Sequence, residues 1–211
     1  TAGNSKVNAK KIYLNNINAS TTYGSKDGLQ VDGNVSLQDN SIVYGDKVSL
    51  KDGASLSYKA DGEYAANKGD RDTADAGTYK ADVAVTGAEL VGNELGNYEL
   101  VNNATGVITV KKATLNVGLN DVVRTYGDTS FTDGTGYGIK DHDALVNGDK
   151  GTVSLNKDAI TDGGLVDNNS KTNNKGNYKW TVGENGIFAE NVANFAKNYD
   201  IQVTAGNSKV N

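Results

Sequence analysis

The chain has 211 residues and a formal net charge of −5 at pH 7, with 22% charged and 7% aromatic residues. The negative charge argues against nucleic acid as a partner, because binding to phosphate groups needs a basic patch. The sequence has no Cys, no Met and one His, which excludes disulfides, thiolate metal sites and most imidazole ligand sets. No apolar run approaches the roughly 20 residues of a membrane span, so no membrane insertion is expected.

Short strands separated by polar turns are predicted along most of the chain. Stretches with strand character lie at 10–17, 47–60, 80–85, 105–110, 112–122, 151–160 and 178–182. In 112–122, Ala113, Leu115, Val117 and Leu119 share one face, and this period of two is typical of a half-buried strand. Helical spacing occurs in 87–98 and 189–199, where we expect at most one or two turns. The predicted fold class is mainly β.

An octapeptide, TAGNSKVN, occupies residues 1–8 and recurs at residues 204–211. An identity of eight consecutive residues is too long to arise by chance. We therefore expect a tandem array, of which the chain holds one period and the beginning of the next. Neighbouring copies of the same repeat are the first expected partners.

The period itself consists of two related halves. TTYGS at 21–25 matches RTYGD at 124–128, and DAGTYKADV at 75–83 matches NKGNYKWTV at 174–182. The offsets stay near 100 residues while few letters are shared, which indicates two diverged domains. We predict one β-rich domain at 1–110 and a second at 111–211, with 204–211 beginning the next period.

These motifs resemble the MBG and YDG repeats of large bacterial surface adhesins, including filamentous-haemagglutinin-like exoproteins. The resemblance rests on the Tyr-Gly elements and on the later Gly, Tyr and Asn-Tyr positions, and it covers nearly the whole chain twice. The family often places a proline-containing turn after its YGD motif, where this chain has Ser25 to Asp27. The resemblance implies a β-grasp-like or immunoglobulin-like sandwich fold, exported to the cell surface or secreted.

Twelve positions recur between the halves and are expected to serve packing of strands and turns. Recurrence in each copy favours a structural role, with each tyrosine hydroxyl bonded to a nearby loop. The positions are Tyr23, Gly24, Gly77, Tyr79, Tyr98 and Gly106 in the first half and Tyr126, Gly127, Gly176, Tyr178, Tyr199 and Gly206 in the second.

Few residues are candidates for chemistry. His142 has no counterpart in the other half, and its loop lacks the Gly and closing Glu of an EF-hand, so no catalytic role and no cofactor are expected. Asp70, Asp72 and Asp75 offer carboxylates for calcium, although the equivalent stretch of the second half has none. Tyr58, Tyr64 and Trp180 are the candidates for a ligand surface, because aromatic faces stack on sugar rings.

The expected function is that of a non-catalytic adhesin repeat, acting as an extended stalk that projects an adhesive region. In the alternative, each repeat binds host or biofilm glycans or matrix proteins and copy number supplies avidity. A third alternative makes the repeats accessory modules of a secreted enzyme.

Overall fold

The computed structural model describes residues 3–39, 41–59, 62–128, 136–166 and 171–211. Its internal contacts divide the chain into two compact units. Unit 1 contains Thr1–Thr21 and Lys26–Lys111, and unit 2 contains Thr22–Ser25 and Lys112–Asn211. Both are mainly β, as the sequence predicts. Among the described residues, no helix has the length and apolar character needed to cross a membrane.

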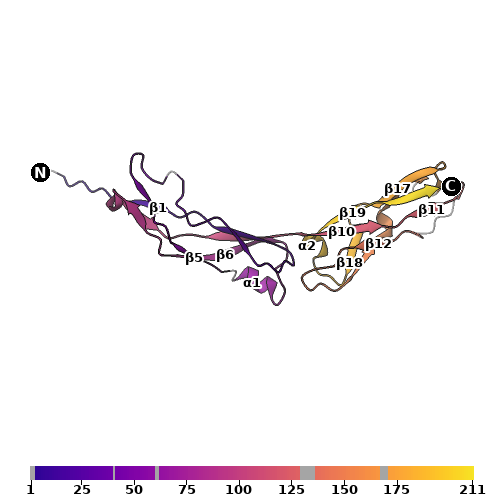
Figure 1. The fold of residues 1–211 in the computed structure, drawn as a ribbon, viewed down its shortest axis with the longest axis horizontal. Helices are drawn as coiled ribbons and strands as arrows, with labels where there is room; N and C mark the ends of the chain where they lie inside the picture. The colour runs from indigo at the N-terminus through magenta and orange to yellow at the C-terminus, as the bar shows by residue number, and fades with distance from the viewer. Residues whose placement is uncertain (1–2, 40, 60–61, 129–135, 167–170) are drawn as a thin grey trace. The chain divides into compact units, whose positions relative to one another are not determined.

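Unit 1 is built around a five-stranded sheet with the order β3-β2-β9-β6-β5. Figure 1 labels its strands β5 and β6 and the helix α1. Two further pairs, β1 with β8 and β4 with β7, complete its described strands. The strands are β1 (Lys10–Tyr13), β2 (Asn18–Thr22), β3 (Gln30–Asp32), β4 (Val48–Leu50), β5 (Ser55–Lys59), β6 (Gly77–Thr86), β7 (Leu90–Gly92), β8 (Tyr98–Val101) and β9 (Gly106–Lys111). Helix α1 (Glu63–Lys68) and the 3-10 turn η1 (Leu95–Asn97) lie between strands.

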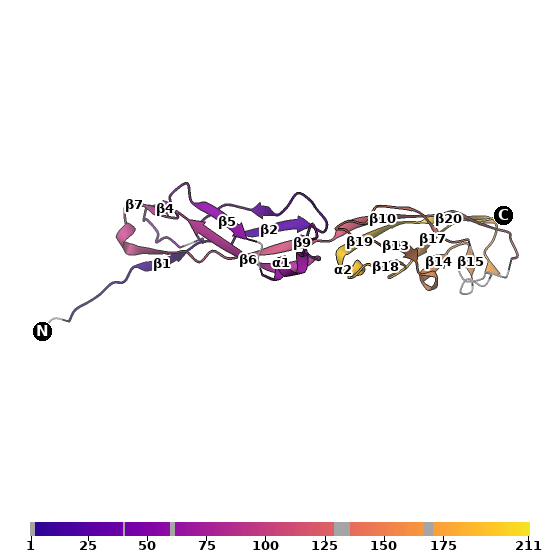
Figure 2. The same ribbon diagram turned by 90° about the horizontal axis from the view of Figure 1, so that it is seen from below.

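Unit 2 contains a four-stranded sheet, β11-β20-β17-β14, and a three-stranded sheet, β12-β10-β19 (Figure 2). Two further pairs, β13 with β18 and β15 with β16, complete its described strands. The strands are β10 (Ala113–Leu119), β11 (Val122–Arg124), β12 (Ile139–His142), β13 (Thr152–Leu155), β14 (Ile160–Asp162), β15 (Leu165–Val166), β16 (Lys171–Thr172), β17 (Gly176–Val182), β18 (Ile187–Glu190), β19 (Tyr199–Thr204) and β20 (Gly206–Val210). The helical turns are η2 (Lys157–Ala159) and α2 (Phe195–Asn198).

The two units use the same strand pairings at equivalent places. β1 runs parallel to β8 in unit 1, and β10 runs parallel to β19 in unit 2. β6 pairs antiparallel with β9, and β17 pairs antiparallel with β20. The registers also correspond, because Gly77 faces Val110 while Gly176 faces Val210. In each unit, the strand that ends the corresponding half of the sequence, β9 or β20, is therefore an internal strand of the main sheet.

The cores follow the predicted alternation. In β10, Ala113, Leu115, Val117 and Leu119 are all buried, so the predicted face is confirmed. The unit 2 core continues through Trp180, whose side chain is fully buried. In unit 1 the fully buried side chains include those of Ile12, Leu14, Ile17 and Ile108. Alternate residues of strands such as β9 and β10 thus bury apolar area, which supplies the main stabilising term of the fold.

The helical segments are short. In 189–199, β18 extends through Glu190 and α2 forms a single turn, because Asn191 and Asn194 adopt positive φ angles of 60° and 56° that no α-helix tolerates. In 87–98, β7 is followed by the 3-10 turn η1. Helix α1 was not predicted, since Tyr64 is its one buried residue and it has no apolar period to detect.

The two copies of the octapeptide differ in structure. The second copy supplies β20, which lies between β11 and β17 in the main sheet of unit 2. In the first copy, residues 3–8 are exposed and form no strand, and β1 begins only at Lys10. The same letters therefore form a sheet strand only where β11 and β17 are available as partners.

Candidate functional site

A Tyr-Gly turn, Thr22–Ser25, forms part of unit 2. The Ser25 backbone N–H donates to the Thr22 carbonyl at 2.9 Å, and Gly24 has a φ of 74°. A positive φ at the third residue is the signature of a type II turn, which favours Gly there. A Cβ on Gly24 would also overlap the side chain of Val146 and the backbone of Asn147. The turn therefore packs closely enough to require Gly at this position.

Tyr23 is held by three residues of unit 2, Val146, Asp149 and Tyr199, which we call the unit 2 cradle. The Tyr199 hydroxyl accepts a hydrogen bond from the Val146 N–H at 2.9 Å and donates to Asp149 Oδ2 at 2.8 Å. The Tyr23 hydroxyl donates to the same carboxylate oxygen at 2.9 Å. The two tyrosine rings meet edge to face with centroids 5.5 Å apart, a favourable aromatic arrangement.

Burial and the neighbouring Asp149 carboxylate raise the pKa of the Tyr199 phenol. The unionised hydroxyl is therefore the donor that binds Asp149 throughout the physiological range. Tyr23 is 2% exposed and Asn147, next to Val146, is 4% exposed. Both side chains are thus inside the packed region that the Tyr-Gly turn completes.

Unit 1 has the same arrangement in Val43, Asp46 and Tyr98, which we call the unit 1 cradle. The Tyr98 hydroxyl accepts from the Val43 N–H at 2.9 Å and donates to Asp46 Oδ2 at 2.6 Å. Here, however, Val43 is 49% exposed and Tyr44 is fully exposed. The unit 1 cradle has the polar geometry of its counterpart but lacks the cover of a Tyr-Gly turn in the described part of the chain.

The second Tyr-Gly turn, Thr125 to Asp128, has the same local conformation as the first. The Asp128 N–H donates to the Thr125 carbonyl at 3.1 Å, and Gly127 has a φ of 92°. Tyr126 is 61% exposed, and a Cβ on Gly127 would meet no heavy atom within 4 Å. This turn therefore presents its tyrosine to solvent.

Sequence reasoning found the tyrosines of the cradles but missed their carboxylates. A signal was present, because VYGDK at 43–47 matches VNGDK at 146–150 at the same offset that relates Tyr23 to Tyr126. The exposed Tyr44 and the buried Asn147 occupy the one position that differs.

The tyrosines of β6 and β17 bond back to the chain just before each strand. The Tyr79 hydroxyl donates to the Asp75 carbonyl and the Tyr178 hydroxyl donates to the Asn174 carbonyl, both at 2.8 Å. Gly77 and Gly176 lie under these rings, and a Cβ on Gly176 would come within 3.2 Å of the Tyr178 ring. Each pair therefore fixes the entry of the chain into a central strand.

Gly106 and Gly206 begin the closing strands β9 and β20. A Cβ on Gly106 would overlap the Ile17 carbonyl, and one on Gly206 would overlap the Asn120 carbonyl and the indole of Trp180. Absence of a side chain is what allows these carbonyls to approach the strand. The two glycines thus have one structural role in the two units.

The predicted ligand-surface aromatics lie largely in the core. Trp180 is fully buried, and its indole N–H donates to the Asn120 carbonyl at 2.7 Å. Tyr64 is 4% exposed and packs edge to face on Tyr79 at 5.5 Å. Tyr58 is half-buried and its hydroxyl donates to the Val107 carbonyl at 2.9 Å. Trp180 and Tyr64 are therefore corrected from ligand candidates to core residues, because a buried ring offers no face to a sugar.

A buried polar cluster surrounds Asp162 in unit 2. The Tyr137 hydroxyl donates to Asp162 Oδ2 at 2.6 Å, and Arg124 Nη2 lies 3.8 Å from the same oxygen. The Tyr137 ring packs on Trp180 with centroids 4.7 Å apart. Burial, followed by the hydrogen bond to Asp162, raises the pKa of Tyr137 to about 12. The neutral Tyr137 and the Arg124 guanidinium together stabilise a carboxylate that is 3% exposed.

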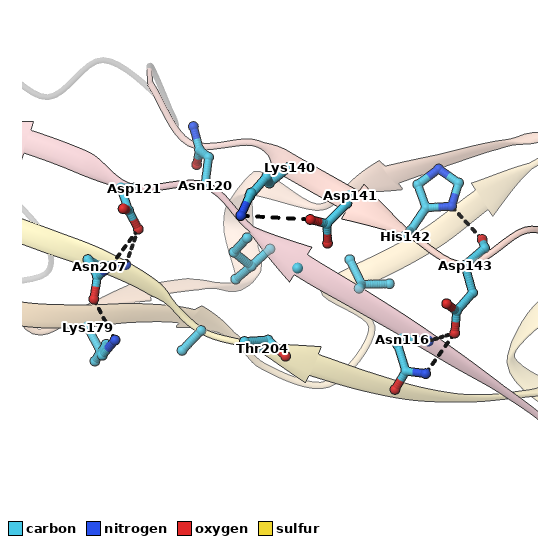
Figure 3. Close-up of a pocket in the computed structure, with 14 residues that line it drawn as sticks. Asn116, Asn120, Asp121, Lys140, Asp141, His142, Asp143, Lys179, Thr204 and Asn207 are labelled. Carbon is cyan, nitrogen blue, oxygen red and sulfur yellow. Dashed lines mark hydrogen bonds and ion pairs between the residues drawn. The ribbon is translucent and has the colours of Figure 1, made fainter.

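A polar groove of about 650 Å³ lies on unit 2 beside β10 and β12 (Figure 3). At one end, Asp143 Oδ2 accepts hydrogen bonds from the backbone and side-chain nitrogens of Asn116 at 2.8 and 2.7 Å, and these bonds lower the pKa of Asp143. His142 Nδ1 lies 2.7 Å from the Asp143 carbonyl oxygen. Because a carbonyl oxygen only accepts, Nδ1 carries the proton in the neutral ring.

The other end of the groove is also internally bonded. Asp121 Oδ1 accepts from the backbone and side-chain nitrogens of Asn207 at 2.9 and 2.8 Å, which lowers the pKa of Asp121. Lys140 and Asp141 form an exposed ion pair at 3.9 Å. That His142 has no catalytic role stays a prediction.

The structure does not bring the three predicted calcium ligands together. Asp75 is 5% exposed and its Oδ1 lies 2.7 Å from Arg71 Nη1, whereas Asp70 and Asp72 are exposed. In the part of the chain that the structure describes, no group of three or more acidic or histidine side chains is arranged to hold a metal ion. Calcium binding at these residues stays a prediction.

Comparison with protein-family models, with curated proteins and with solved structures finds no match to this chain.

Proposed function

We propose that this chain is a non-catalytic repeat of a bacterial cell-surface adhesin, which acts with further copies as a stalk that projects an adhesive region. The observation that carries the proposal is the octapeptide shared by residues 1–8 and 204–211. Its second copy is an integral strand of unit 2, paired on both sides. In a tandem array, each copy of the octapeptide would close one unit and lead directly into the first strand of the next.

Short connections support an extended array over a flexible one. Within the chain, Lys112 alone separates β9 from β10. After the first octapeptide, Ala9 alone precedes β1. Connections of one residue leave little freedom between successive strands, unlike a flexible polar linker. We infer that each half of the period is one domain, with bounds near 110 and 111.

The mixed strand directions favour the β-grasp-like alternative for each domain. Immunoglobulin-type sandwiches are built from antiparallel sheets. In this chain β10 runs parallel to β19 and β11 runs parallel to β20. The same units contain little helix, and we propose a β-grasp-like strand arrangement with its helix reduced to single turns.

Small-angle X-ray scattering on one period and on two periods joined through a shared octapeptide tests the stalk. The proposal predicts that the maximum dimension nearly doubles with the second period, because each domain adds a fixed rise. The same measurement with calcium and with a chelator tests whether an ion bound at Asp70 to Asp75 stiffens the connections between domains. A two-period protein no longer than one period would contradict the stalk.

The polar groove supports a second candidate, a glycan-binding repeat that works by avidity. Its amide, carboxylate and ammonium groups, from Asn116, Asp143 and Lys140 among others, are suited to sugar hydroxyls (Figure 3). A fluorescently labelled single period is incubated with a glycan array and with host cells. The stalk alone predicts no binding, whereas binding that Asp143→Asn and Lys140→Ala abolish would favour the adhesive module.

A further inference from the structure

The unit 1 cradle and the exposed turn at Tyr126 are complementary parts of one contact. We propose that the Tyr-Gly turn of one copy, Tyr126-Gly127, docks on the unit 1 cradle of the next copy and locks successive periods together. The inference rests on the proposed tandem array. It deepens that function by naming the surface through which one copy binds another.

The unit 2 cradle supplies the geometry of the docked state. There, a Tyr-Gly turn places its phenol 2.9 Å from Asp149 Oδ2 and its ring edge to face on Tyr199. The incoming hydroxyl shares the carboxylate oxygen with the Tyr199 hydroxyl, so one Asp accepts from two phenols. A carboxylate oxygen has the lone pairs to accept both bonds.

The unit 1 cradle has the same acceptor already oriented. The Tyr98 hydroxyl donates to Asp46 Oδ2 at 2.6 Å and accepts from the Val43 N–H at 2.9 Å, as the equivalent groups do in unit 2. In the described part of the chain, Tyr98 is the hydrogen-bond partner of the Asp46 carboxylate. Asp46 therefore has acceptor capacity for a second phenol, and the cradle needs no rearrangement to receive it.

The unit 1 cradle is more exposed than the unit 2 cradle at the positions that a docked turn would cover. Val43 is 49% exposed and Tyr44 is fully exposed, although their counterparts Val146 and Asn147 are partly and fully buried under Tyr23-Gly24. An apolar and an aromatic side chain at the surface beside a preformed polar anchor are typical of a site that a partner covers.

The Tyr126 turn already has the local conformation of the Tyr23 turn. It has the hydrogen bond and the positive Gly φ of the Tyr23 turn, so its phenol and its glycine have the same local presentation. Gly24 makes a contact that a Cβ would block, whereas the space beside Gly127 is open. In the docked state the next copy would fill this space, as Val146 and Asn147 fill the space beside Gly24.

Tyrosine nitration with tetranitromethane tests the contact in a two-period protein, residues 1–203 followed by 1–211. Tyr126→Phe in the second copy gives its tryptic peptide a distinct mass, so that the junction Tyr126 is read alone. We expect the junction Tyr126 to react about tenfold more slowly than Tyr126 of the single period, which corresponds to about 1.4 kcal/mol of docking.

Three variants of the two-period protein make the test specific. Asp46→Asn in the second copy removes the carboxylate, and Gly127→Ala in the first copy adds a Cβ that would block the contact. Because Gly127 has a positive φ, each variant is compared with a single period that carries the same substitution, and each should react at the rate of that single period. Asp149→Asn in the second copy is the matched control. It should accelerate nitration of Tyr23 in that copy and leave the junction Tyr126 protected.

Nitration of the junction Tyr126 at the rate of the single period would overturn the docking proposal. Protection that survives both Asp46→Asn and Gly127→Ala would overturn it as well, because the contact would then lie elsewhere. Scattering data on the same protein separate this failure from failure of the stalk. If the junction Tyr126 is unprotected and the protein is elongated, the docking proposal is wrong but the stalk proposal stands. If the protein is compact, the stalk proposal is wrong.

Discussion

Tyr199 links the core of unit 2 to the segment that carries Tyr23. Its hydroxyl is bonded on one side to the Val146 N–H and on the other to the Asp149 carboxylate. The ring is 2% exposed and packs against both Tyr23 and Phe195. At the scale of single residues, one phenol thus combines packing with the satisfaction of two buried polar partners.

Tyr199→Phe is expected to destabilise unit 2 by about 1–3 kcal/mol, because it leaves a buried N–H and a carboxylate without one partner each. Urea unfolding followed by the fluorescence of Trp180, the single tryptophan, reports on unit 2. Tyr178→Phe is the control, since its hydroxyl bonds to an exposed carbonyl that water can satisfy. Equal losses in the two variants would contradict the assigned role of Tyr199.

Tyr137 predicts a loss of stability at alkaline pH. Its pKa is raised from the ordinary value of 10.0 to about 12 in the folded chain. The folded state therefore retains a proton that the unfolded state loses, and the contribution is fully present below pH 10 and declines as pH rises through about 12. Urea midpoints at pH 8, 10 and 11.5, read by Trp180 fluorescence, should fall over the last interval.

In Tyr137→Phe this part of the alkaline decline should disappear. A decline of the same size in the variant would show that other buried tyrosines, Tyr199 among them, account for it.

Recurrence in the sequence identified which tyrosines matter, but it did not identify their partners. Tyr23 and Tyr199 were found because each has an equivalent one half-period away. Asp149 lies in a Gly-containing loop whose sequence is typical of a solvated turn. Trp180 is a lone aromatic whose ring packs on Tyr137 and whose indole N–H donates to the Asn120 carbonyl. Contacts with residues far away in the sequence determine the surroundings of Asp149 and Trp180, and local sequence patterns do not predict such contacts.

At the scale of elements, the alternation of β10 predicted its buried face because one side of the strand meets the core throughout its length. Pairing partners were not predictable in the same way. β10 pairs with β19, more than 80 residues away, and parallel pairing leaves no turn signal between the strands. The short helical turns also escaped exact placement, since Asn residues at positive φ interrupt 189–199.

Two matched deletions test the structural difference between the octapeptide copies. Deletion of 204–211 should unfold unit 2, because β20 provides the partner of both β11 and β17. Deletion of 1–8 should leave the unfolding free energy within about 0.5 kcal/mol, because the described residues 3–8 are exposed and belong to no strand. Circular dichroism and Trp180 fluorescence measure both. Similar stability of the two deletion variants would refute the assignment of β20.

Gly206→Ala tests the close approach at the start of β20. The added Cβ would overlap the Asn120 carbonyl and the Trp180 indole, so we expect a loss of about 1–3 kcal/mol. Gly183→Ala, in the same unit, is the control, because its Cβ would have its nearest heavy atom at 3.8 Å, an ordinary van der Waals distance, and its φ is not positive. A neutral Gly206→Ala in the same urea assay would show that the strand shifts without cost.

At the scale of the whole molecule, the repeats in the sequence and the strand pairings agree on a period of two related halves. The pairs β6 with β9 and β17 with β20 have corresponding registers. The two cradles differ in exposure, because the one in unit 2 is covered and the one in unit 1 is open within the described residues. An array of periods would cover each open cradle with the turn of the preceding copy.

Electron microscopy of proteins with two, four and six periods tests the stalk most directly, through the contour length of single particles. The stalk account predicts thin particles whose length rises by a constant increment per period, because each period repeats the same units and the same short connections. Compact particles, or lengths that do not grow with the number of periods, would contradict it.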